Sequence, residues 1–203
     1  MWALIEDNTI TKIINNPKAI VIGDTHHSRN IFSFRWTNAE REAIGLYEVV
    51  FNNTKKKDEE YYTNTNQSFA FADGVVTASY GSATAKAHAD TLFTAQDEID
   101  GKGTEGEVAV EGLKTQFIRT VKAQAAGELQ NTDWYIVRKA DADTAVPSAI
   151  TTHRAAVRTK CAEMETAITN AADTAAIKTL YTYIEQEDGS HTRPLGELPT
   201  LEV

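Results

Sequence analysis

Short apolar or β-branched segments separated by turn residues fill the first 80 residues of the chain, a pattern that predicts β-strands. The predicted strands are residues 2–6, 9–14, 19–22, 31–34, 46–51, 67–72 and 75–80. The strongest hairpin signal is Asp73-Gly74, because this pair tolerates the positive φ angles of a type I′ turn. Asp7-Asn8 predicts a second hairpin between the first two strands.

Helix signals dominate the second half of the chain. The predicted helices are residues 83–99, 110–129, 147–168 and 173–184, each with apolar residues three or four positions apart. Pro147 and Asp173 suit the first turns of the last two helices. One short helix is also predicted in the first half, where Thr37 and Glu40 form a capping box and Gly45 can end the helix.

These elements predict an α+β fold in three parts. We expect a β-rich docking domain at residues 1–81, made of a small antiparallel sheet, and a helical domain at residues 82–188. Residues 189–203 contain two prolines and no hydrophobic period, so they predict an extended tail that wanders or lies along a partner.

The chain is acidic, with 29 acidic against 20 basic residues and a formal net charge of −9. This charge argues against nucleic-acid and anionic-membrane partners, which attract positive surfaces. The single cysteine, Cys161, excludes an intrachain disulfide and fits synthesis in a reducing cytoplasm. We expect neither a signal peptide nor a membrane span, because the chain has no basic start followed by a long apolar run.

One segment has the pattern of a metal site. Residues 19–30, AIVIGDTHHSRN, resemble the opening motif of calcineurin-like metallophosphoesterases, in which the aspartate and histidine hold a metal ion. None of the five histidines follows an asparagine or belongs to a second His-X-His motif, so the further ligands are missing. We therefore expect Asp24, His26 and His27 to be turn residues that leave a strand, and keep a metallophosphoesterase only as a third hypothesis.

The sequence offers no other candidate for catalysis. Cys161 falls on the apolar face of its predicted helix, without a neighbouring histidine that could activate the thiol. There is no Gly-X-Ser-X-Gly elbow, P-loop or dinucleotide fingerprint. We expect a non-enzymatic protein with no cofactor and no metal.

Four residues are predicted to bind a partner. Arg154 and Arg158 lie one helical turn apart and share a face that suits an acidic partner, although pairing with local acids is an alternative. Trp134 and Tyr135 lie between two predicted helices. Such a pair either locks the two helices together or anchors an interface, where aromatic residues and arginines are enriched.

Several of these motifs resemble segments of known proteins. The helix at residues 112–129, the TDWYIVR of residues 132–138, the AVP of residues 145–147 and the RAAVR of residues 154–158 follow one another as in the C-terminal segments of small phage tail proteins. That group includes tail-fibre assembly chaperones and related virion proteins. Residues 1–19 and 37–50 are similar to the beginning of small phage structural proteins.

The resemblance implies a non-enzymatic role in the tail of a bacteriophage. We expect a virion structural protein of the fibre or baseplate, made in the host cytoplasm and present as several symmetric copies that contact other tail proteins. The alternative is a tail-fibre assembly chaperone. Many relatives of the chaperone type have Tyr-Arg at the start of the last long helix, where this chain has His153-Arg154, and this departure favours the structural protein.

Overall fold

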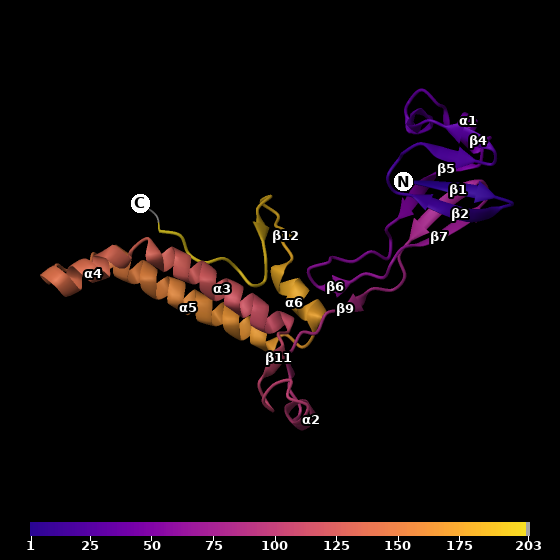
Figure 1. The fold of residues 1–203 in the computed structure, drawn as a ribbon. Helices are drawn as coiled ribbons and strands as arrows, with labels where there is room; N and C mark the ends of the chain where they lie inside the picture. The colour runs from indigo at the N-terminus through magenta and orange to yellow at the C-terminus, as the bar shows by residue number, and fades with distance from the viewer. Residues whose placement is uncertain (202–203) are drawn as a thin grey trace. The chain divides into compact units, whose positions relative to one another are not determined.

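The computed structural model describes residues 1–201 and confirms the α+β class, with strands concentrated in the first part of the chain and long helices in the second (Figure 1). The chain divides into two compact units, Met1–Thr84 and the part that begins at Ala85. The boundaries predicted from the sequence after residues 81 and 188 stay predictions. Among the described residues, no helix is both long and apolar enough to cross a membrane.

The first unit contains a five-stranded sheet with the strand order β2-β1-β5-β8-β7. Its strands are β1 (Trp2–Glu6), β2 (Thr9–Ile14), β5 (Leu46–Asn52), β7 (Ser68–Ala72) and β8 (Val75–Ser79). Both predicted hairpin turns are confirmed, since Asp7, Asn8, Asp73 and Gly74 all have positive φ angles. The sheet is mixed rather than purely antiparallel as predicted, because β5 and β8 pair in parallel.

Alternation along β1 and β5 places apolar side chains on both faces of this sheet. One cluster of buried residues contains Ala3, Ile5, Val49, Val76 and Ala78. A second cluster contains Ile14, Ile31 and Leu46, with Trp2 and Trp36 packed against it. The sheet therefore has a core on each side.

The segment between β2 and β5 covers the second cluster. It contains the hairpin of β3 (Ile20–Ile22) and β4 (Thr25–His27), the 3₁₀ helix η1 (Arg29–Phe32) and the short helix α1 (Asn38–Glu42). The capping box of Thr37 and Glu40 begins α1 as predicted, and Gly45 follows the helix with φ of 78°.

The strand predicted at residues 31–34 is wrong, because η1 occupies its first half and the rest is a bend and a turn. The Ser28 side chain accepts a hydrogen bond from the Asn30 N–H and so caps this helix. Arg41 is buried, and its guanidinium donates to the carbonyl oxygens of Ile31 and Ser33. These contacts satisfy backbone groups that a strand would have paired with a neighbour.

In the second unit, α3 (Leu113–Gln130) and α5 (Ser148–Asn170) run side by side and are joined through α4 (Asp133–Ala142) (Figure 1). Most of the predicted apolar stripes are confirmed as buried, namely Leu113, Phe117, Val121 and Ala125 on α3 and Ile150, Val157, Cys161, Met164 and Ile168 on α5, where His153 and Arg154 are also buried. Val110, predicted to begin the stripe of α3, is exposed instead. The helix α6 (Thr174–Tyr181) packs through buried Ile177 and through the Tyr181 ring, whose centroid lies 4.5 Å from that of Phe117.

The helix predicted at residues 83–99 is mostly wrong. The segment forms β9 (Thr84–Ala85), which pairs with β6 (Tyr62–Thr63), then β10 (Thr91–Leu92) and only then the short helix α2 (Ala95–Ile99). Strand β10 pairs with β11 (Val108–Val110), so α3 begins at Leu113 rather than at Val110. The carbonyl oxygens of Ala87 and His88 accept hydrogen bonds from the first turn of α3. These partners, distant in sequence, override the helix propensity of the alanines.

The predicted tail is partly folded onto its own unit. His191–Thr192 is the strand β13, which forms a hairpin with β12 (Ile184–Glu185). Leu195 is buried, and its N–H donates to the carbonyl oxygen of Leu180. Residues 202–203, the end of the predicted tail, lie outside the described residues.

Candidate partner-binding site on helix α4

The short helix α4 has no buried residue, although it contains several large apolar side chains. Trp134 is 50% exposed, Ile136 44% and Val137 65%. On a helix Trp134, Val137 and Ala140 follow one another three positions apart, and Ile136 lies beside Ala140, four positions away. We call Trp134, Ile136, Val137 and Ala140 the α4 surface. An apolar surface without a covering element is typical of a protein interaction site.

An aromatic and cationic stack orders one edge of the α4 surface. The rings of Trp134 and Tyr135 are 3.8 Å apart between centroids, at an interplanar angle of 33°. The Arg138 guanidinium lies 4.8 Å from the Trp134 ring and 5.4 Å from the Tyr135 ring. A cation over an aromatic face is attracted by the ring quadrupole. The stack therefore holds the two rings in place before any partner binds.

Arg154 of α5 connects α4 to the end of α3. Its guanidinium donates to the Leu129 carbonyl oxygen at 2.8 Å and to the Thr132 hydroxyl at 2.7 Å, and it pairs with Asp133 at 2.8 Å. The last carbonyl oxygens of a helix have no partner within that helix, so a cation there satisfies them and complements the helix dipole. Arg154 therefore fixes the direction in which α4 leaves α3.

The structure separates the four residues predicted to bind a partner. Trp134 and Arg158 are exposed and Tyr135 is partly exposed, whereas Arg154 is 7% exposed and bound within the chain. The expected shared basic face of the two arginines is thus absent, because Arg154 turns toward Asp133 while Arg158 donates to the Arg154 carbonyl oxygen at 3.3 Å. The stacked aromatic pair lies on the exposed α4 rather than locking two helices together.

Four further residues of this site are not predicted from the sequence, namely Ile136, Val137, Arg138 and Ala140. The signal was the four-residue spacing of Trp134 and Arg138, which places an arginine beside an aromatic ring on a helix. This spacing has a meaning only on a helix, and the sequence pattern predicts none between residues 130 and 147. Asp133 in the first turn of α4, beside the positive end of the helix dipole, also favours this helix.

The histidine-rich segment lies in the first unit, in the hairpin of β3 and β4. Gly23 and Asp24 make the turn between β3 and β4, while His26 and His27 lie in β4 rather than in the turn where we expected them. The His27 ring packs against Trp36, with centroids 6.0 Å apart. Within residues 1–201, no group of three or more histidine, cysteine, aspartate or glutamate side chains is placed to hold a metal ion.

Cys161 lies in the helix pair, where its thiol donates to Glu165 at 3.4 Å. Burial and the neighbouring carboxylate raise the pKa of this thiol above its ordinary value, which opposes formation of the thiolate.

Comparison with protein-family models, with curated proteins and with solved structures finds no match for this chain.

Proposed function

We propose that this chain is a non-enzymatic structural protein of a bacteriophage tail, associated with the fibre or the baseplate, and that it attaches to another tail protein through the α4 surface. The proposal rests on the order of motifs in residues 112–158 and on one structural observation. That observation is an apolar helix surface, ordered by the Trp134–Tyr135–Arg138 stack, that no described part of the chain covers.

The α4 surface suits attachment for an energetic reason. Tryptophan, tyrosine and arginine are the residues that most often dominate the binding energy of protein interfaces. Trp134 and Tyr135 are already stacked, so binding immobilises fewer free side chains. In the proposal the β-rich unit contacts neighbouring subunits, and exposed Phe34, Val50 and Phe51 give it apolar surface for this purpose. The protein is made in the host cytoplasm and is present in several symmetric copies.

The first test is quantitative mass spectrometry of gradient-purified phage particles. We expect the chain at a fixed ratio to the tail proteins. Abundance in the infected-cell lysate together with absence from particles would refute the structural role and favour the tail-fibre assembly chaperone.

The second test concerns the surface. Trp134→Ser should lower incorporation into particles about 30-fold, the loss expected when an interface residue worth about 2 kcal/mol is removed. Ile184→Ser is the matched control, because Ile184 is 52% exposed in the same unit but lies in β12. Equal incorporation of both variants would exclude the α4 surface as the attachment site.

A further inference from the structure

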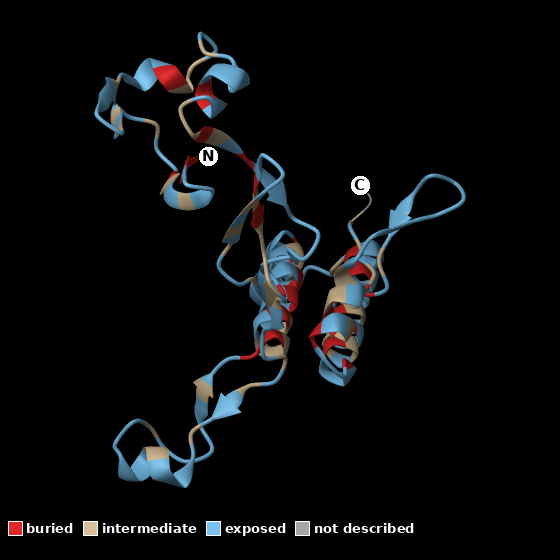
Figure 2. Cartoon of the chain, turned by 90° about the vertical axis from the view of Figure 1, so that its right-hand side faces the viewer, coloured by how far each residue is buried: buried red, intermediate tan, exposed pale blue. Residues whose placement is uncertain are grey.

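A second uncovered apolar surface lies on residues 91–110, which we call the arm. The arm consists of β10, α2 and β11 and projects from the start of α3 (Figure 1). Most of it is exposed (Figure 2). At its base, the Asp90 carboxylate accepts hydrogen bonds from the Gly112 N–H and the Thr115 hydroxyl, both at 2.7 Å. These bonds tie the arm to the first turn of α3.

The base of the arm requires glycine at position 112. A Cβ atom at Gly112 would overlap the backbone of Ala89, so only glycine permits the two segments to approach this closely. Farther along, the Phe93 N–H donates to the Glu107 carbonyl oxygen at 2.9 Å, and the Gly106 N–H donates to the Phe93 carbonyl oxygen at 3.0 Å. The arm is therefore hydrogen-bonded along its length.

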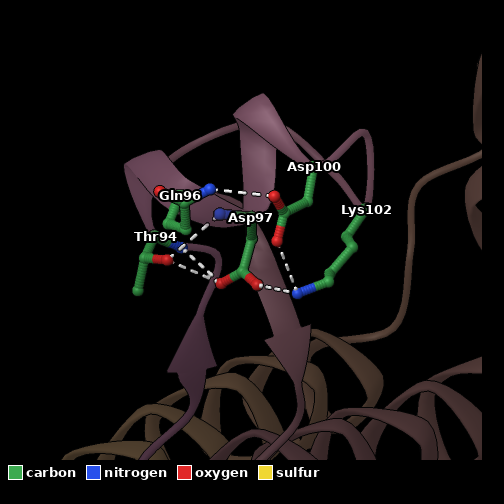
Figure 3. A network of polar contacts seen from close by, with 5 residues as sticks. All are labelled: Thr94, Gln96, Asp97, Asp100 and Lys102. Atoms are coloured by element: carbon green, nitrogen blue, oxygen red, sulfur yellow. Dashed lines mark hydrogen bonds and ion pairs between the residues drawn. The ribbon is translucent and has the colours of Figure 1, made fainter.

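The tip of the arm is held by a polar network (Figure 3). Thr94 and Asp97 form a capping box at the start of α2. Lys102 lies 3.0 Å from an Asp97 oxygen and 3.1 Å from an Asp100 oxygen, and Gln96 donates to Asp100 at 2.8 Å. The Thr94 hydroxyl and N–H, with Lys102, lower the pKa of Asp97 to about 2. The network keeps the tip in one conformation without a partner.

The strands of the arm present apolar side chains to solvent. Leu92 and Val108 are register partners and share one face of the ribbon, whereas the register shifts beside them and pairs Val110 with Thr91. The exposed fractions of Leu92 and Val108 are 48% and 47%, and Ile99 on α2 is 78% exposed. A two-stranded ribbon is only marginally stable by itself and leaves both outer edges unpaired. An ordered ribbon with an uncovered apolar face is thus prepared to accept another strand.

The charge of the arm indicates which kind of strand it would bind. Its acidic residues are Asp97, Glu98, Asp100, Glu105 and Glu107, against the single basic residue Lys102. Lys102 pairs with Asp97 and Asp100, while no cation in residues 1–201 forms an ion pair with Glu98, Glu105 or Glu107. A second arm, a nucleic acid or an anionic membrane would be repelled by this excess of carboxylates.

We propose that the arm is a docking site for an extended protein segment that has apolar residues on one face and is flanked by lysine or arginine. The apolar face would cover Leu92 and Val108, and the basic residues would lie beside Glu105 and Glu107. Binding by strand addition would also pair an open edge of the ribbon. This inference depends only on the shape and charge of the arm, so it stands apart from the proposed function in a phage tail.

The test uses a defined probe and the full chain. A fluorescent peptide of about eight residues, the length of an ordinary strand, alternates valine with lysine, and a reference peptide alternates valine with glutamate. Fluorescence anisotropy should show binding of the lysine peptide that weakens as salt is added, and no binding of the glutamate peptide. Equal binding of the two peptides would contradict a charge-selective site.

Two variants of the arm locate the site. Val108→Ser should weaken binding of the lysine peptide about tenfold. The double change Glu105→Gln with Glu107→Gln should weaken binding and reduce its salt dependence, and this variant tests the proposal if Val108→Ser fails to fold. The β12–β13 hairpin offers matched controls, because Ile184, Glu185 and Glu187 are exposed there in the same way. Ile184→Ser and the pair Glu185→Gln with Glu187→Gln should bind as the unchanged chain does.

Two results would overturn the proposal. One is equal affinity of the arm variants and the β12–β13 controls for the lysine peptide, because binding would then reflect only the net charge of −9. The other is self-association of the full chain in analytical ultracentrifugation that disappears in Val108→Ser, because the occupant of the arm would then be a second copy.

Discussion

At the scale of single residues, Arg154 links three segments. Its side chain joins α5 to the end of α3 through the Leu129 carbonyl oxygen and to the start of α4 through Thr132 and Asp133. Thr132 is itself 2% exposed, so its hydroxyl has no access to water. The buried guanidinium is satisfied by these partners.

Replacement of Arg154 should therefore destabilise the fold. Arg154→Ala leaves the Leu129 carbonyl oxygen without this donor and should cost about 1–3 kcal/mol in the free energy of unfolding, measured by urea denaturation. Arg158→Ala, one helical turn away at an exposed position, should change the free energy of unfolding by less than about 0.5 kcal/mol. Equal losses in the two variants would refute the structural role of Arg154.

At the scale of elements, the short helix α2 depends on its first residues. A helix of five residues is far below the length at which a helix is stable alone, so its caps and tertiary contacts hold it. Asp97 stabilises the helix start in two ways. It accepts hydrogen bonds from the Thr94 N–H and hydroxyl, and it forms an ion pair with Lys102. The pKa of Asp97 reports how well this cap is formed.

The capping box predicts that the stability of α2 depends on pH. The pKa of Asp97 is about 2 against an ordinary value of 3.8, and a carboxyl with a lowered pKa stabilises the folded state at pH above its unfolded value. Protection of α2 amides in hydrogen exchange should therefore be complete above pH 4 or so and fall as the pH drops toward 2.

Substitutions at the two ends of this network test the cause. Thr94→Val should raise the pKa of Asp97 toward 3.8 in an NMR titration of its carboxyl carbon, because hydrogen bonding by Thr94 is the largest cause of the shift. Lys102→Met should raise it less. The reverse order of effects would identify the ion pair, not the cap, as the source of the low pKa.

At the scale of the whole molecule, each of the two units has its own buried apolar side chains. Leu46 is fully buried in the first unit, and Ile168 is fully buried in the second. Domains with separate cores can open separately, with free energies that differ from one unit to the next.

Core substitutions should therefore act within one unit. Leu46→Ala and Ile168→Ala should each cost about 2–5 kcal/mol, through lost burial and the cavity left behind. Hydrogen exchange followed by mass spectrometry should show faster exchange in the unit that contains the substitution and unchanged exchange in the other. Faster exchange of both units in either variant would show that they unfold as one.

Local interactions explain which features the sequence by itself determined. The Asp73-Gly74 turn and the capping box of Thr37 and Glu40 involve residues within four positions of each other, so their signals are complete in a short segment. The apolar stripes of α3 and α5 follow from the 3.6-residue period of the helix, which identifies the buried face without a knowledge of its partner. The α+β class rests on these same periodicities.

Contacts between distant residues decided the rest. Residues 83–99 form strands and one short helix because their partners lie at Val108–Val110 and at the first turn of α3. Arg154 is buried because Leu129, Thr132 and Asp133, more than 20 positions earlier, surround its guanidinium. Trp134 is exposed because no element within residues 1–201 covers α4. Local pattern specifies the type and buried face of an element, whereas the exposure of a side chain depends on what the folded chain places beside it.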